Sequence, residues 1–135
     1  MTPGVVAAIR FMGAVPQFTV PDVVRTAEYY RDVLGFHIAG YWRTPPVFAI
    51  VRRDTVEVFF NRADGSTVRT GRAEGAYDAY FHIAGVEAFA AELRASGADI
   101  LEGPVIREYE RRELVLRDCN GLVLAFGEDT IRRDV

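Results

Sequence analysis

The stretch VPDVVRTAEYYRDVLGF, residues 20–36, decides the fold because its pattern occurs twice in the chain. Val20 can end a strand, Asp22 can cap a helix, and Gly35 fits the left-handed position that ends one. The stretch IAGVEAFAAELRASGADI, residues 83–100, repeats the strand end, the helix and the glycine stop with one deletion. An internal repeat of this length indicates two copies of one βα unit.

Each predicted helix has one apolar stripe, with residues three and four positions apart. The stripes are Val23, Ala27, Tyr30 and Leu34 in the first copy, and Val86, Phe89, Ala90 and Leu93 in the second. Runs rich in β-branched and aromatic residues predict strands at 14–20, 36–42, 47–53, 55–60, 77–83, 113–117 and 122–127, with short strands near Ile100 and Arg107. Asn120-Gly121 predicts a tight hairpin turn.

The order predicts an α+β fold of two pseudo-symmetric βαβββ modules, which form curved mixed sheets around a groove. The modules span about 11–62 and 77–128, and a glycine-rich linker spans about 63–76. Each helix covers one strand face and leaves the other for the groove. Alternation places Phe18, Val20, Phe81 and Ile83 under the helices, and Gln17, Thr19, Asp78, Tyr80 and His82 in the groove.

The composition indicates one soluble globular domain of 135 residues. The net charge is −3 and the 16 Lys and Arg residues are scattered, so we expect neither a nucleic acid nor a membrane as partner. The single Cys119 cannot form an internal disulfide, and we read it as a bystander. The N-terminal stretch lacks a basic region typical of a signal peptide, so we expect a cytoplasmic protein.

The chain resembles the vicinal oxygen chelate superfamily of glyoxalase I, extradiol dioxygenases and bleomycin resistance proteins, most closely the bleomycin-resistance-like members. The resemblance covers roughly residues 14–128 and implies a homodimer whose two grooves are each built from both subunits. It is carried by P-x-F-x-V-P-D (16–22), YYRDVLGF (29–36), Arg112-Glu113-Leu114, Asp118-x-x-Gly121 and Phe126-Gly127-Glu128.

Metal-dependent members of this superfamily bind a divalent ion through four residues, which by position are Val15, Phe59, Asp78 and Ala125 here. Three of these side chains have no ligand atom, and a divalent transition metal needs about three protein ligands. We therefore predict no metal and no cofactor. A non-standard site from Glu57, His82 and Asp78 stays open as an alternative, although two residues four apart on a strand are about 13 Å apart.

Eight residues are candidates for ligand binding: Gln17, Trp42, Phe48, Phe59, Asp78, Tyr80, His82 and Tyr109. Aromatic walls with a few polar groups are typical of small-molecule sites, although Trp42 and Phe59 can equally belong to the core, as can Tyr41. An aromatic ring at Phe59, in place of a metal ligand, favours a planar aromatic ligand. His82 and Tyr80 can act as general acid or base, or can simply hydrogen-bond a ligand.

Two functions follow from the resemblance and these residues. The first is a metal-free protein that sequesters an aromatic or drug-like molecule without turnover. The alternative is a lyase, isomerase or dioxygenase of the same superfamily that uses His82, Tyr80 and Glu57 for catalysis. We expect His37 to be a surface residue, and Arg112 and Glu113 to pair with each other across strands rather than anchor a ligand.

Overall fold

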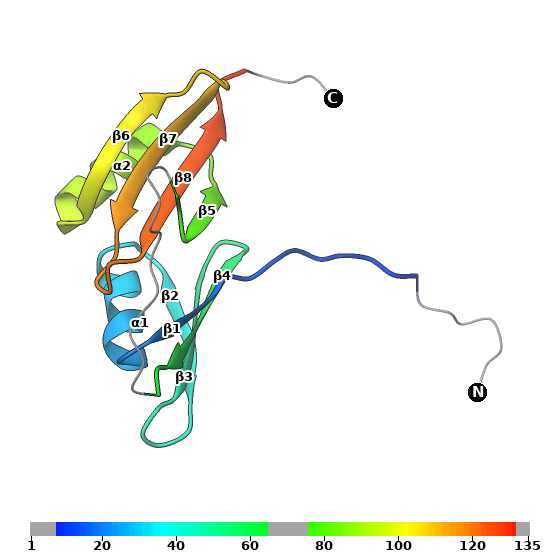
Figure 1. Cartoon of the computed structure of the whole chain (residues 1–135), viewed down its shortest axis with the longest axis vertical. Helices are drawn as coiled ribbons and strands as arrows, with labels where there is room; N and C mark the ends of the chain where they lie inside the picture. Colours follow the sequence, from blue (N-terminus) through cyan, green and yellow to red (C-terminus); the bar gives the residue numbers. More distant parts are fainter. Residues whose placement is uncertain (1–7, 65–75, 132–135) are drawn as a thin grey trace.

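The computed structural model describes residues 8–64 and 76–131, which form two βαβββ modules. The first module contains β1 (Gln17–Val20), α1 (Val23–Asp32), β2 (His37–Trp42), β3 (Phe48–Arg53) and β4 (Val56–Arg62). The second contains β5 (Ala79–His82), α2 (Val86–Ser96), β6 (Asp99–Ile106), β7 (Arg111–Arg117) and β8 (Val123–Asp129). Figure 1 shows the modules stacked along the long axis, with the second above the first. The predicted doubling of one βαβββ unit is confirmed.

Each module has one four-stranded mixed sheet. The strand orders are β1-β4-β3-β2 and β5-β8-β7-β6, so the repeat extends to the topology. The first strand of each module pairs in parallel with the last, and the other pairs are antiparallel. No helix in the described ranges is long and apolar enough to cross a membrane.

The core forms where each helix packs on its own sheet. Every residue of the two predicted apolar stripes is buried, and Tyr30 and Leu34 are completely so. Val20 and Phe81 are buried beneath the helices, and Phe18 and Ile83 pack against the same core. The predicted division of strand faces is therefore confirmed for the apolar side.

Several predicted strand boundaries are wrong, because a strand begins and ends where its backbone pairs with the neighbouring strand. β1 starts at Gln17 rather than residue 14, because its register with β4 begins opposite Phe59. The strands predicted near Ile100 and Arg107 are one strand, β6, interrupted by bulges. The loop between β7 and β8 is longer than a two-residue turn and spans 118–122. Within the predicted linker, residues 65–75 lie outside the described residues.

The two helices are capped in different ways at their N-termini. Asp22 caps α1 by accepting hydrogen bonds from the backbone of Val24 and Arg25, at 3.1 and 3.0 Å. The equivalent residue of α2 is Gly85, which has no side chain to do this. The carboxylate of Glu128, at the end of β8, accepts from the backbone N–H of Gly85 at 2.9 Å and of Val86 at 3.1 Å. The glutamate of the Phe-Gly-Glu motif is thus a helix cap supplied by a distant strand.

Replacing Glu128 by alanine is expected to lower the free energy of unfolding by about 1 kcal/mol, the usual effect of losing a helix cap. The hydrogen bond from Gly85 is the main cause that lowers the pKa of Glu128 below its ordinary value. The stabilisation is therefore present above the ordinary pKa of a glutamate and is lost as pH falls through the lowered pKa. Urea unfolding at neutral and acidic pH checks this. The prediction is contradicted if the difference in free energy of unfolding between Glu128→Ala and the parent is the same at both pH values. Asp22→Ala removes the corresponding N-terminal cap of α1 and is the matched control.

Several hydrogen bonds and ion pairs of the described residues connect the two modules. They are Tyr30 with Asp118 at 2.7 Å, Asn120 with Thr26 at 3.0 Å, Ser96 with the Val33 carbonyl at 2.7 Å, and Arg53 with Glu92 at 2.6 Å. The first two join α1 to the β7–β8 loop, and the last two join α2 to the first module. The modules are therefore held together on both sides of their junction.

Candidate functional site

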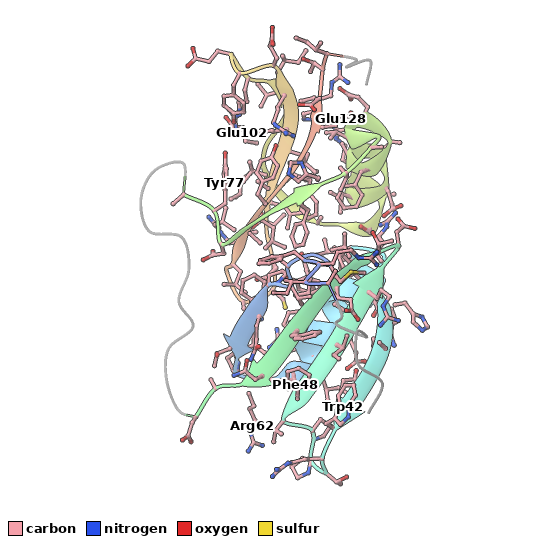
Figure 2. All side chains as sticks on the ribbon, turned by 90° about the vertical axis from the view of Figure 1, so that its right-hand side faces the viewer. Trp42, Phe48, Arg62, Tyr77, Glu102 and Glu128 are labelled. Atoms are coloured by element: carbon pink, nitrogen blue, oxygen red, sulfur yellow. The ribbon has the colours of Figure 1, made fainter. Side chains whose placement is uncertain are left out.

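The open face of the first sheet has a continuous row of aromatic rings. The ring centroids of Trp42 and Phe48 are 5.7 Å apart, and those of Phe48 and Phe59 are 5.4 Å apart, both in edge-to-face geometry. Figure 2 looks onto this face, with Phe48 and Trp42 toward its lower end. Trp42 is 47% exposed, so the end of the row is available to a ligand. The structure brings these three predicted residues together on the face that the helix leaves open.

A polar margin runs beside the aromatic row. Gln17 lies opposite Phe59 in the β1–β4 register and donates to the Asn61 side-chain oxygen at 2.9 Å. The Asn61 amide in turn donates to Thr19 at 3.1 Å. Amide and hydroxyl groups therefore border the aromatic rings, which is the composition expected of a small-molecule surface.

Tyr41 does not belong to this face. It lies opposite Ala49, a fully buried core residue, in the β2–β3 register, and is therefore on the helix side of the sheet.

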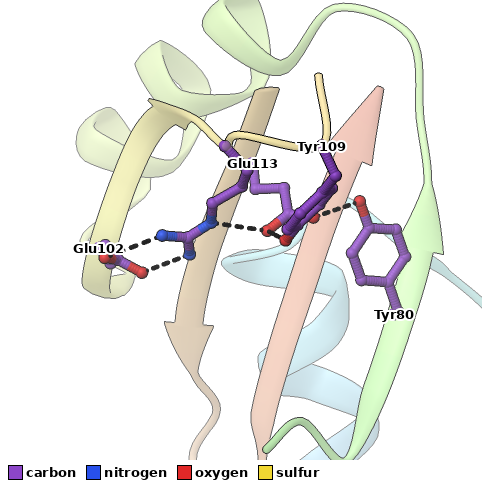
Figure 3. Close-up of polar contacts among 5 residues, drawn as sticks. Tyr80, Glu102, Tyr109 and Glu113 are labelled. Carbon is purple, nitrogen blue, oxygen red and sulfur yellow. Dashed lines mark hydrogen bonds and ion pairs between the residues drawn. The ribbon is translucent and has the colours of Figure 1, made fainter. Parts of the chain in front are cut away.

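The open face of the second sheet is built around a buried carboxylate, Glu113 on β7, shown in Figure 3. It accepts hydrogen bonds from the Tyr80 hydroxyl at 2.7 Å, the Tyr109 hydroxyl at 2.8 Å and Arg107 Nε at 2.9 Å. Its residue exposure is 0%. Burial would raise the pKa of Glu113, but these three hydrogen bonds outweigh it and hold the pKa below its ordinary value. The group is therefore an ionised carboxylate at neutral pH.

Gly127 on β8 makes the Tyr80 contact possible, because Tyr80 must reach across β8 from β5 to β7. A Cβ at Gly127 would lie 1.9 Å from the Tyr80 hydroxyl oxygen and 3.2 Å from Glu113 Cγ. The glycine of the Phe-Gly-Glu motif thus leaves the space through which the tyrosine reaches the carboxylate.

Both His82 and Tyr80 have polar partners in this arrangement. Arg111 Nη1 donates to His82 Nδ1 at 3.2 Å, which places the proton of a neutral imidazole on Nε2. Burial and then the hydrogen bond to Glu113 raise the pKa of Tyr80 to about 12, so it stays protonated near neutral pH. Both side chains lie on the predicted open face, with ring centroids 5.4 Å apart.

The four positions that bind metal in metal-dependent relatives do not fit a metal here. Val15 precedes β1, Phe59 is in the aromatic row, and Ala125 is buried. Asp78 accepts a hydrogen bond from the Val123 backbone at 2.8 Å. One carboxylate among four positions is too few ligands for a divalent transition metal.

The non-standard metal alternative is not formed in the described part of the chain, which contains no group of three or more His, Cys, Asp or Glu placed to hold an ion. Glu57 lies on the first sheet and pairs with Arg52 at 2.6 Å, while His82 lies on the second. The structure does not bring Glu57, His82 and Asp78 together.

Three further sequence interpretations can be compared with the structure. Arg112 and Glu113 do not pair with each other, because Arg112 pairs with Glu128 at 3.5 Å and Glu113 faces the other side of the sheet. That prediction is wrong. Burial raises the pKa of the Cys119 thiol to about 11, which agrees with its reading as a bystander. His37 is exposed, as predicted.

One cavity of about 400 Å³ lies at the junction of the modules, between the β3–β4 turn and the start of α2. Its apolar walls include Phe36, Phe81 and Phe89, and the Arg53–Glu92 ion pair lies at its edge. It does not include the aromatic row of the first sheet or Glu113 of the second. Of the residues predicted to line the groove, His82 borders this cavity, and the others lie on the two different sheets of the described chain.

The fold and these faces define a class: proteins of two βαβββ modules, each with one sheet face covered by a helix and one left open. A profile of the Glyoxalase/Bleomycin resistance protein/Dioxygenase superfamily matches residues 12–126, and the chain belongs to this superfamily. The resemblance inferred from the sequence is confirmed at this level. No curated protein matches the chain.

Solved structures show the same fold at low sequence identity. TioX from Micromonospora sp. ML1 has a TM-score of 0.70 at 17% identity, over 85% of this chain and 96% of that one. A glyoxalase/bleomycin resistance protein/dioxygenase from Nocardioides has a TM-score of 0.66 at 17% identity, over 92% and 87%. UcmS2 has a TM-score of 0.64 at 17% identity, over 87% and 98%. These likenesses concern the fold alone.

The sequence interpretation missed the Glu113 cluster, since it assigned Glu113 only a structural pairing with Arg112. The signal was present in the alternation of β7. Leu114 and Leu116 are core residues, so Glu113 and Val115 must face the open side. What the alternation could not supply was the identity of the partners, because they come from β5 and from the β6–β7 turn.

Proposed function

We propose that this chain binds a small aromatic or drug-like molecule without chemical turnover, in the manner of the bleomycin-resistance-like members of its superfamily. The observation that carries the proposal is Phe59. It occupies a position where metal-dependent relatives have a ligand, and its ring continues the row formed by Phe48 and Trp42. A planar ligand gains most from such rings through stacking and edge-to-face contacts.

We further propose that the binding unit is a homodimer in which the open face of one copy is covered by the other. Two facts support this. The two open faces are on separate sheets, and an uncovered sheet face buries too little of a ligand for useful affinity. In addition, the segment before β1 leads away from the body in Figure 1 with its apolar side chains exposed: Ile9 is 91% and Phe11 93% exposed. Apolar groups of this kind favour contact with a second chain.

The alternative, an enzyme of the same superfamily using His82, Tyr80 and Glu57, has less support. The Nδ1 of His82 accepts from Arg111, and Tyr80 is held protonated by burial and then by its hydrogen bond to Glu113. Glu57 is paired with Arg52 on the other sheet. Conversion of a superfamily substrate that disappears in His82→Ala, with binding retained, would favour the enzyme.

Acridine, a planar aromatic that is neutral at pH 8, is expected to quench the fluorescence of Trp42, the single tryptophan of the chain. Phe59→Ala should weaken its affinity about tenfold, because the neighbouring ring of the row is lost. Tyr41→Ala is the matched control, since it removes an aromatic from the same region on the helix side and should leave the affinity unchanged.

Saturable quenching that Phe59→Ala weakens and Tyr41→Ala does not would support the proposal. No quenching, or equal effects of the two variants, would contradict it. Elemental analysis that finds about one tightly bound transition metal per chain would contradict the metal-free part. A strictly monomeric protein by light scattering, with acridine still bound, would contradict the dimer.

A further inference from the structure

The Glu113 cluster has no evident reason in stability. Replacing a buried ion pair by well-packed apolar residues is often neutral or stabilising. Apart from Arg111 and the three donors, the open-face neighbours of Glu113 are small or apolar, namely Val115, Ala125 and Gly127. A valine or leucine at 113 would match them. The chain instead holds an ionised carboxylate beneath two phenols, which points to a role in recognition.

The cluster has an excess of negative charge. Arg107 makes ion pairs with both Glu102, at 2.5 Å, and Glu113, at 2.9 Å. Two carboxylates therefore share one guanidinium, and the tyrosines are neutral. Arg111 lies on the same face, and its charge is offset by Asp129 at 3.5 Å. One net negative charge therefore remains, and such a charge attracts a cation.

The rings around Glu113 also suit a cation. Tyr77 and Tyr80 have ring centroids 6.3 Å apart, and Arg111 already places its guanidinium carbon 5.8 Å from the Tyr80 centroid. A phenol face and a carboxylate together make a favourable environment for a positively charged nitrogen, through charge and through the ring quadrupole.

The three donors to Glu113 differ in how firmly they are held. Tyr80 is fixed by the space at Gly127, and Arg107 is fixed by Glu102. Tyr109 lies in the turn between β6 and β7, is 57% exposed, and donates to the same carboxylate oxygen as Arg107. Its hydroxyl is therefore the donor that can be exchanged with the least disturbance.

We propose that Glu113 is the recognition carboxylate for a cationic, N–H-bearing group of the ligand, and that this group replaces the Tyr109 hydroxyl on Glu113. The proposal rests on the proposed function, because it names the ligand class of that site: a planar aromatic that carries a protonated amine or amidine. Tyr80 and Arg107 stay in place and orient the carboxylate. In the homodimer proposed above, the aromatic part of the ligand lies against the aromatic row of Trp42, Phe48 and Phe59 on the sheet that covers the cluster.

The test compares 9-aminoacridine, a planar cation at pH 8, with acridine, its neutral analogue, by quenching of Trp42. The cation is expected to bind about tenfold more tightly than acridine, the size of one charge-assisted hydrogen bond. Glu113→Gln should abolish that difference and leave the affinity for acridine unchanged. Glu28→Gln, which removes an exposed carboxylate from α1 on the helix side of the first sheet, should preserve the difference and is the matched control.

Tyr109→Phe provides the second, independent readout and does not depend on Glu113→Gln being folded. If the Tyr109 hydroxyl is displaced by the ligand, its removal should leave binding of the cation as tight or tighter. Weaker binding of the cation to Tyr109→Phe would overturn the exchange. Equal affinities of the two acridines for the parent protein would overturn the inference alone, whereas a failure of both to bind would overturn the proposed function with it.

Discussion

Gly127→Ala is expected to lower the free energy of unfolding by about 1–3 kcal/mol, the usual effect of overpacking. The new methyl carbon would lie 1.9 Å from the Tyr80 hydroxyl oxygen and 2.7 Å from Tyr80 Cζ, both far inside contact distance. Gly127 is not among the residues with positive φ, so backbone strain adds nothing and the effect is steric. Tyr80 must therefore move, and its hydrogen bond to Glu113 is lost with it.

A double-mutant cycle isolates this effect. Tyr80→Ala removes the group that the methyl would meet, so Gly127→Ala should be nearly neutral when made in Tyr80→Ala. Urea unfolding of the four proteins gives the coupling energy. In addition, Gly127→Ala should lower the pKa of a tyrosine from about 12 toward its ordinary value, measured by ultraviolet titration. Additive effects of the two changes would show that Gly127 has another role.

Much of the fold could be predicted because local patterns and tertiary packing agree. Asp22 at the start of α1 and Gly35 after its end have the expected roles, and Gly35 has φ of +74°. The stripe from Val23 to Leu34 is buried as its spacing requires. The β6 strand was harder to predict, since bulges and the positive φ of Gly103 interrupt its alternation.

The candidate site was predictable on one sheet and only partly on the other. Phe59 and Trp42 fall at strand positions that could face the groove, and the resemblance placed Phe59 there as well, but the sequence left core packing open for both. The roles of Gly127 and Glu128 could not be predicted, since they depend on Tyr80 and Gly85, which are more than 40 residues away. Alternation assigns a face to a side chain, but the partner on that face depends on strand order and register.

The contact between Asp118 and Tyr30 has the same long-range character, and Asp118→Ala is expected to lower the free energy of unfolding by about 3 kcal/mol or more. Asp118 is 5% exposed and accepts three hydrogen bonds. They come from the Tyr30 hydroxyl at 2.7 Å, the Asn120 backbone at 2.8 Å and the Leu122 backbone at 2.9 Å. Its removal leaves three donors without an acceptor, two of them buried, and breaks a link between the modules.

Tyr30→Phe tests how this loss divides between the loop and the module junction. It removes only the hydroxyl, keeps the buried ring, and leaves Asp118 with its two backbone donors, so it should cost about 1 kcal/mol. Thermal unfolding followed by circular dichroism should show a large fall in Tm for Asp118→Ala and a small one for Tyr30→Phe. If the two variants are equally destabilised, the tyrosine contact accounts for the whole effect. If Tyr30→Phe is neutral, Asp118 acts only within the β7–β8 loop, and the modules are held by Arg53, Ser96, Asn120 and the shared core.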